Sequence, residues 1–84
     1  MIRTTLTQVF AEVFEEHAGG EAPTLADASV LLETGLDSLG FAILVTRLED
    51  ELGYDPFTEA AEAVYPRTFG ELVAFYERHA PAAA

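Results

Sequence analysis

The sequence contains no cysteine and no lysine, and its four basic residues are all arginine. Without cysteine, the chain has no disulfide scaffold, no zinc–thiolate site and no cysteine nucleophile. Its first five residues lack the basic and apolar regions of a signal peptide. The longest uncharged run in the central segment, residues 38–46, is far too short to cross a bilayer. We therefore expect a cytoplasmic protein without a membrane partner.

The shortage of basic residues leaves the chain strongly acidic. Fifteen Asp and Glu residues against four arginines give a formal net charge of -11. Such a surface repels nucleic acid, which argues against a DNA- or RNA-binding role. It favours proteins with basic patches as partners, although acidity alone also keeps a small domain soluble. The length of 84 residues, half of them hydrophobic, predicts one monomeric domain over 1–84, with 80–84 as a tail.

Apolar residues recur at helical spacing and predict an all-α fold: a small bundle of three main helices and a short third helix. The expected helices cover about 5–17, 37 or 38 to 53, 58 to about 64, and a last segment that starts after residue 68. Thr5 with Gln8 and Thr68 with Glu71 each have the spacing of a capping box. Gly53 lies where a glycine commonly ends a helix.

A long loop is expected between the first and second helices, over residues 18–37. Loops of this length are uncommon in compact domains unless they are functional or packed down. Five apolar residues interrupt this one: Leu25, Val30, Leu31, Leu32 and Leu36. They predict a loop packed across the core, with a short helical turn within 26–32 and a tight turn at Thr34-Gly35.

The second helix is unusual because it carries two apolar stripes. The first consists of Phe41, Leu44, Val45, Leu48 and Leu52, and the second of Leu39, Ala42, Ile43 and Thr46. A surface helix of a small domain needs one such stripe for its core. The second stripe is therefore available for another contact. From Glu33 to Glu62 there are also eight acidic residues and a single basic one, Arg47.

The segment 35–40, Gly-Leu-Asp-Ser-Leu-Gly, carries the functional prediction. It brings the hydroxyl of Ser38 to the start of a helix, with Asp37 as a favoured N-cap residue. A helix start has partial positive charge and free amide groups, which favour an attached anion such as a phosphodiester.

With these features, the sequence resembles the acyl carrier protein family over nearly its whole length. The hallmark of that family is Asp-Ser-Leu at the start of the second helix, matched here by Asp37, Ser38 and Leu39. The resemblance implies that Ser38 carries 4'-phosphopantetheine, taken from coenzyme A by a magnesium-dependent phosphopantetheinyl transferase. It implies a standalone, non-enzymatic carrier that holds acyl groups as thioesters, which explains the missing cysteine.

By the same resemblance, Asp37 caps the helix and helps the transferase, whereas Leu39, Ala42 and Ile43 face partner enzymes. These partners would be an acyl-activating ligase or synthase and transferase enzymes. Many fatty-acid carriers have an acidic residue at the position of Ile43. Its apolar replacement indicates a dedicated set of partners in a specialised biosynthetic pathway. The Gly-Gly pair common before Asp-Ser in peptidyl carriers is absent, and polyketide carriers remain open.

The charge and the helical pattern also fit an alternative from a different class of protein. An acidic helical adaptor or inhibitor, binding a basic protein without a prosthetic group, would share the charge and the fold but would not need Ser38. A hydrolase nucleophile is excluded because Gly35 lies three residues before Ser38 rather than two. His17 and His79 lie at expected helix ends without a metal-ligand pattern. We predict no catalytic residue and no metal site.

Two interpretations of the position of the aromatic residues are possible. The simplest is that Phe41, Phe57, Tyr65, Phe69 and Tyr76 fill the core. The other is that they line a cleft beside the second helix that shelters an acyl chain.

Overall fold

A computed structural model describes residues 2–59 and 66–80 of the chain, and within these ranges the fold is all-helical. The elements are α1 (Ile2–His17), the 3-10 turn η1 (Leu31–Glu33), α2 (Ser38–Leu52), α3 (Pro56–Glu59) and α4 (Phe69–Arg78). The described ranges contain no β-strand beyond an isolated antiparallel bridge between Val30 and Thr68. The predicted small helical bundle is confirmed.

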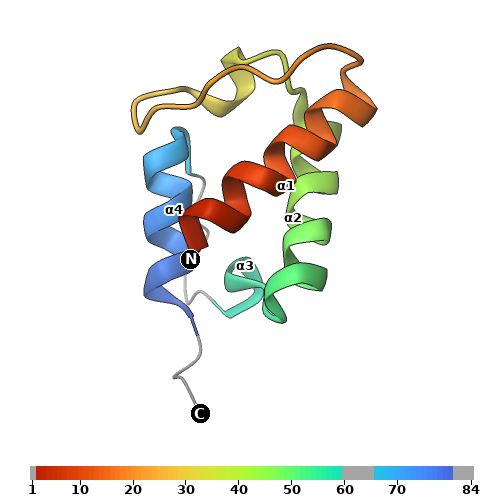
Figure 1. Cartoon of the computed structure of the whole chain (residues 1–84). Helices are drawn as coiled ribbons and strands as arrows, with labels where there is room; N and C mark the ends of the chain where they lie inside the picture. The colour runs from red at the N-terminus through yellow and green to blue at the C-terminus, as the bar shows by residue number, and fades with distance from the viewer. Residues whose placement is uncertain (1, 60–65, 81–84) are drawn as a thin grey trace.

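Helix α1 packs against both α2 and α4 and crosses them obliquely (Figure 1). The loop between α1 and α2 passes over one end of the bundle, and α3 lies at the other end. Apolar side chains from every main helix meet in one core: Leu6, Val9, Phe10, Val13, Phe14, Leu31, Leu36, Leu44, Leu48, Tyr54, Phe69, Leu72, Val73 and Tyr76. None of the described helices is both long enough and apolar enough to cross a membrane.

Both boundaries of α2 and the start of α4 agree with the prediction, because local signals set them. Gly53 takes the left-handed conformation (φ 83°) that ends α2. At the start of α4, Thr68 Oγ1 accepts the amide hydrogen of Glu71 at 3.1 Å. The Glu71 carboxylate accepts the Thr68 amide hydrogen at 3.1 Å in return, which completes the predicted capping box.

Two predicted helix starts are wrong. Helix α1 begins at Ile2, not Thr5, so Thr5 lies inside the helix and the capping box at Thr5 is absent. Ile2 packs against the core, and this burial supports an additional turn at the start.

The short third helix begins at Pro56 rather than Thr58. Asp55 stabilises this start because its Oδ1 accepts the amide hydrogen of Phe57 at 2.9 Å and its Oδ2 the hydroxyl of Thr58 at 3.1 Å. An Asp-Pro pair is a helix-start signal that the sequence prediction missed. The helix was predicted to continue to about residue 64, and residues 60–65 lie outside the described ranges.

The loop between α1 and α2 packs against the core, as predicted, but one of its five apolar residues is exposed to solvent. Leu31 and Leu36 are fully buried, Leu25 and Val30 are half-buried, and Leu32 is 59% exposed. The loop is also bonded to the start of α4: the Leu31 amide donates to the Arg67 carbonyl at 2.9 Å. The predicted helical turn is present only as η1. Its last residue is followed by Thr34, whose hydroxyl donates to the Leu31 carbonyl at 2.6 Å.

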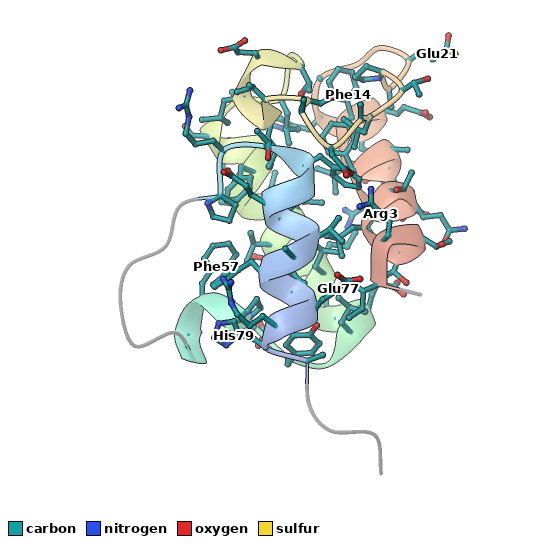
Figure 2. All side chains as sticks on the ribbon, turned by 90° about the vertical axis from the view of Figure 1, so that its left-hand side faces the viewer. Arg3, Phe14, Glu21, Phe57, Glu77 and His79 are labelled. Carbon is teal, nitrogen blue, oxygen red and sulfur yellow. The ribbon has the colours of Figure 1, made fainter. Side chains whose placement is uncertain are left out.

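The aromatic residues divide into two groups. Phe69 and Tyr76 are buried in the core as predicted, whereas Phe41 and Phe57 are only partly buried. Figure 2 shows Phe57 beside α4, whose Phe75 meets the Phe57 ring edge-on at 4.8 Å between centroids. Tyr65, also predicted as core, lies outside the described residues. The two partly buried rings are therefore available to line a cavity.

Candidate functional site

Ser38 is the first residue of α2, and its side chain is exposed. Its hydroxyl makes no hydrogen bond to any of the described residues. Because α2 has 15 residues, its first turn presents free amide groups and the positive end of a full helix dipole. The position therefore suits an attached group that is anionic near its point of attachment.

Asp37 is the N-cap residue of α2, as the sequence predicted. Its Oδ1 accepts the Gly40 amide hydrogen at 2.8 Å. The same oxygen lies 3.1 Å from Nε2 of His17, the last residue of α1. These contacts lower the pKa of Asp37 below its ordinary value of 3.8, chiefly through the Gly40 amide and secondarily through His17. Asp37 therefore stays ionised to lower pH than a free carboxylate, and its side chain is fixed to the first turn of α2.

Gly40 is buried where α2 meets the end of α1. A β-carbon at this position would lie 2.5 Å from Cδ1 of Leu36 and 3.0 Å from Cδ2 of His17. The absence of a side chain thus lets His17 lie against the first turn of α2 and reach Asp37.

The turn before Ser38 depends on Gly35. This residue has φ 110°, which side-chain-bearing residues rarely adopt, and the tight turn predicted at Thr34-Gly35 is present. The Phe14 ring lies within 3.3 Å of the position that a β-carbon would occupy. The next residue, Leu36, is buried in the core. The contacts of Gly35 and Leu36 therefore fix the segment that leads into Ser38.

The second apolar stripe of α2 is largely uncovered. Leu39 is 61% exposed, Ala42 is exposed and Ile43 is half-buried. One turn further on, the guanidinium of Arg47 donates to both carboxylate oxygens of Glu16 on α1, at 2.9 and 3.2 Å. This contact lowers the pKa of Glu16, through its hydrogen bond to Arg47. The acidic residues Glu49, Asp50 and Glu51 of the same helix are all exposed.

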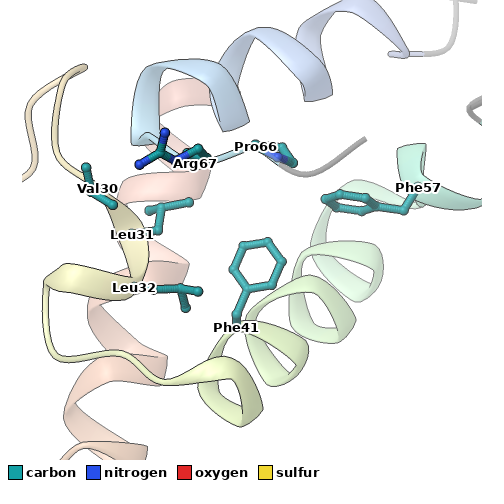
Figure 3. Close-up of a pocket in the computed structure, with 7 residues that line it drawn as sticks. All are labelled: Val30, Leu31, Leu32, Phe41, Phe57, Pro66 and Arg67. Carbon is teal, nitrogen blue, oxygen red and sulfur yellow. The ribbon is translucent and has the colours of Figure 1, made fainter. Parts of the chain in front are cut away.

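An apolar pocket of about 230 Å³ lies beside α2, next to Phe41 (Figure 3). Its lining comes from the loop, from α2, from α3 and from the segment before α4: Val30, Leu31, Leu32, Phe41, Phe57, Pro66 and Arg67. Phe41 and Phe57 meet edge-on at 6.2 Å between centroids and do not fill this space. The second interpretation of the aromatic residues therefore holds in part: a cleft lies beside α2, but only Phe41 and Phe57 of that set are found on its lining, while Phe69 and Tyr76 lie in the core.

Sequence reasoning located Asp37, Ser38, Leu39, Ala42 and Ile43 on one helix, but it missed the residues that connect this helix to the others. His17 was interpreted as a helix-end residue, and its contact with Asp37 spans 20 positions. Glu16 carried no signal at all, although it is the partner of Arg47. The role of Gly40 was also missed, although a glycine inside a helix commonly marks close packing.

The pKa shift of Asp37 predicts a pH-dependent contribution to stability. Because its pKa is lowered on folding, charged Asp37 stabilises the fold above pH 3.8. This contribution is lost as the pH falls through the lowered value. Asp37→Asn retains a capping oxygen but does not titrate.

We therefore expect wild type to exceed Asp37→Asn in free energy of unfolding at pH 7, with the difference shrinking below pH 3.8. Urea titrations of both proteins measure this difference. The lowered pKa values of Glu16 and Glu71 affect both proteins alike and cancel. A difference that stays constant as the pH falls would contradict the coupling.

Three comparisons with known proteins bear on this site. A protein-family model described as a phosphopantetheine attachment site matches residues 4–75, which is most of the chain. Searches of curated proteins and of solved structures returned no match.

Proposed function

Because this chain belongs to the family of phosphopantetheine attachment site proteins, we propose that it is an acyl carrier protein whose prosthetic arm is attached at Ser38. Members of this family are carriers rather than enzymes, and they bear 4'-phosphopantetheine covalently. When attached, the group supplies a terminal thiol on which acyl groups are held as thioesters. The protein contributes the position of the arm and the surfaces that partner enzymes recognise.

One observation carries the assignment of the site: Ser38 is exposed at the start of α2, and its hydroxyl is unpartnered among residues 2–59 and 66–80. The chain's other serine, Ser29, is half-buried, and its Oγ accepts the Ala26 amide hydrogen at 2.9 Å. Of the two hydroxyls, only that of Ser38 combines access with a helix N-terminus suited to a phosphodiester. Transfer of the arm from coenzyme A to wild type, but not to Ser38→Ala, tests this assignment.

In this proposal Asp37 fixes the first turn of α2 and helps the phosphopantetheinyl transferase. The exposed apolar residues Leu39 and Ala42, with Ile43 beside them, form the docking surface for the enzymes that load and use the acyl group. The exposed acids of α2 attract the basic surfaces of those enzymes. An acidic adaptor without a prosthetic group has no use for an attachment site, and the family membership therefore does not favour that alternative.

We propose further that these enzymes form a dedicated set in a specialised pathway rather than a general fatty-acid synthase. Two features support this: Ile43 is apolar where many fatty-acid carriers are acidic, and Arg47, one turn on, is paired with Glu16. At the position of Ile43 the face thus lacks the negative charge that such synthases would meet, and Arg47 offsets the charge of Glu16.

Ile43→Glu tests this proposal with a housekeeping fatty-acid transferase at low salt. We expect wild type to be a poor substrate and Ile43→Glu to raise kcat/KM by up to about tenfold, through faster encounter. Gln8→Glu adds the same charge on an exposed position of α1 and should have little effect. Efficient use of the wild type by this transferase would overturn the proposal.

The apolar pocket is proposed as the shelter of the acyl group. Phe41, which lines it, follows Ser38 by three residues, about 4.5 Å along the helix axis. Its volume of about 230 Å³ exceeds the roughly 150 Å³ of an apolar protein cavity that takes up benzene. An acyl chain within it would be removed from water, which favours its burial in proportion to the apolar area covered.

A further inference from the structure

Among the described residues that line the apolar pocket, one is charged, Arg67. Its backbone is fixed on both sides: the Arg67 amide donates to Glu71 Oε1 at 2.8 Å, and its carbonyl accepts the Leu31 amide hydrogen at 2.9 Å. The side chain is exposed, and its guanidinium makes no hydrogen bond or ion pair with any residue in 2–59 or 66–80. Arg67 is thus held at the pocket, and none of the described residues occupies its guanidinium donors.

The other three arginines are all engaged. Arg3 pairs with Asp27 at 2.7 Å, and Arg47 pairs with Glu16. The Arg78 guanidinium lies over the Phe75 ring at 5.7 Å from its centroid. Within the described residues, Arg67 is therefore the one arginine whose guanidinium has no partner, in a chain whose formal charge is -11.

The nearby carboxylate of Glu71 does not satisfy Arg67. Its Oε1 accepts the amide hydrogens of both Arg67 and Thr68, and these two bonds are the main cause of its lowered pKa. The Glu71 carboxylate is therefore part of the cap of α4. Its interaction with the Arg67 side chain is electrostatic, without a hydrogen bond to the guanidinium.

One side of the pocket lies nearer to the start of α2, and so to the proposed attachment site, than the other. Figure 3 shows Leu32 and Phe41 on the side nearest the beginning of α2, and Arg67 and Pro66 on the opposite side. A chain that enters from the Ser38 end passes between the two apolar side chains first. Its far end then comes to the side where the guanidinium lies.

From these observations we infer that the pocket is selective for acyl groups with an apolar body and a carboxylate at the end farthest from the thioester. The apolar lining takes the body, and Arg67 donates to the terminal carboxylate, a match of charge and hydrogen-bonding geometry. The inference rests on the proposed function, because the acyl group must be tethered at Ser38.

The test uses a pair of arms that differ only at the far end. A broad-specificity phosphopantetheinyl transferase, supplied with octanoyl- or suberyl-coenzyme A, attaches the matching acyl arm, and intact mass confirms loading. The measured quantity is the rate of thioester cleavage by hydroxylamine, divided by the rate for the same acyl-coenzyme A free in solution.

We expect wild type to protect both thioesters, and the suberyl thioester about two- to fivefold more than the octanoyl one at low salt, as for an exposed ion pair. The excess should disappear in Arg67→Gln and in high salt. It should persist in Arg78→Gln, which removes the same charge from a residue that does not line the pocket. In nuclear magnetic resonance spectra, the Arg67 Nε–H signal should shift with the suberyl arm and not with the octanoyl arm.

Equal protection of the two thioesters in wild type would overturn the inference, as would an excess that survives in Arg67→Gln. Both results leave the carrier function intact, since loading itself has succeeded. Failure of the transferase to load either arm would instead overturn the attachment at Ser38, and this inference with it.

Discussion

Incubated with coenzyme A, magnesium and a broad-specificity phosphopantetheinyl transferase, the wild-type protein should gain the mass of one phosphopantetheine, whereas Ser38→Ala should gain none. The loss is complete because the serine oxygen is the atom to which the arm is joined. Ser38 is exposed, has no internal partner among the described residues, and lies at the positive end of α2. Intact mass spectrometry measures both proteins directly.

The matched control is Ser29→Ala, which removes the chain's other serine. It should be modified as fully as wild type, because Ser29 is half-buried in the loop. Circular dichroism should show that Ser38→Ala remains folded, since alanine is well tolerated in the first turn of a helix. A mass gain in Ser38→Ala would show that the arm is attached elsewhere. If folded wild type gained no mass with two different transferases, the result would contradict the carrier function and favour the acidic adaptor.

Gly40→Ala should destabilise the protein, although helix propensity alone predicts the opposite sign. Replacing a glycine inside a helix with alanine ordinarily adds up to about 1 kcal/mol of stability. Here the new β-carbon would lie 2.5 Å from Leu36 Cδ1, in a side chain that is fully buried. Overpacking of this kind costs about 1–3 kcal/mol, so the net expectation after the gain in helix propensity is a loss of up to about 2 kcal/mol.

The same substitution should disturb the site, because the β-carbon also meets the His17 ring at 3.0 Å. Displacement of His17 removes its contact with Asp37 and should slow arm transfer to Ser38. Urea unfolding measures the first effect, and transferase kinetics on the folded variant measure the second.

Gly20→Ala serves as the control, because nothing lies within 4 Å of its β-carbon position and its φ is not positive. Its stability should equal or slightly exceed that of wild type. If Gly40→Ala were as stable as Gly20→Ala, the close packing of α1 against the first turn of α2 would be refuted.

The sequence was enough to predict those features that arise from interactions between residues a few positions apart in the chain. Asp37 caps α2 by reaching the amide of Gly40, three positions on, and Thr68 caps α4 through Glu71 at the same separation. The start of α3 also depends on neighbouring residues, because Asp55 accepts the Phe57 amide hydrogen. The Asp-Pro pair at 55–56 would therefore have placed the start of this helix correctly, in place of Thr58. The early start of α1 is different, since Ile2 belongs to the helix because it packs against the core.

The burial of individual apolar residues was less predictable. Leu31 and Leu32 are neighbours of the same type in the same loop, yet the first is buried and the second is 59% exposed. Phe41 and Phe57 belong to the aromatic set expected to fill the core, and they line a pocket instead. Composition and spacing do not distinguish these outcomes, because each depends on which element lies opposite the side chain.

By itself, the sequence determined that this protein is a small acidic helical bundle with a serine at the start of its second main helix. Local hydrogen bonds and helical periodicity act between residues close in the chain, and they can be read without coordinates. Only the tertiary structure decided what surrounds that serine. The contacts of His17 with Asp37 and of Glu16 with Arg47 join residues 20 and 31 positions apart. The pocket that Arg67 borders forms where four separate segments meet, and that meeting follows from how the helices pack.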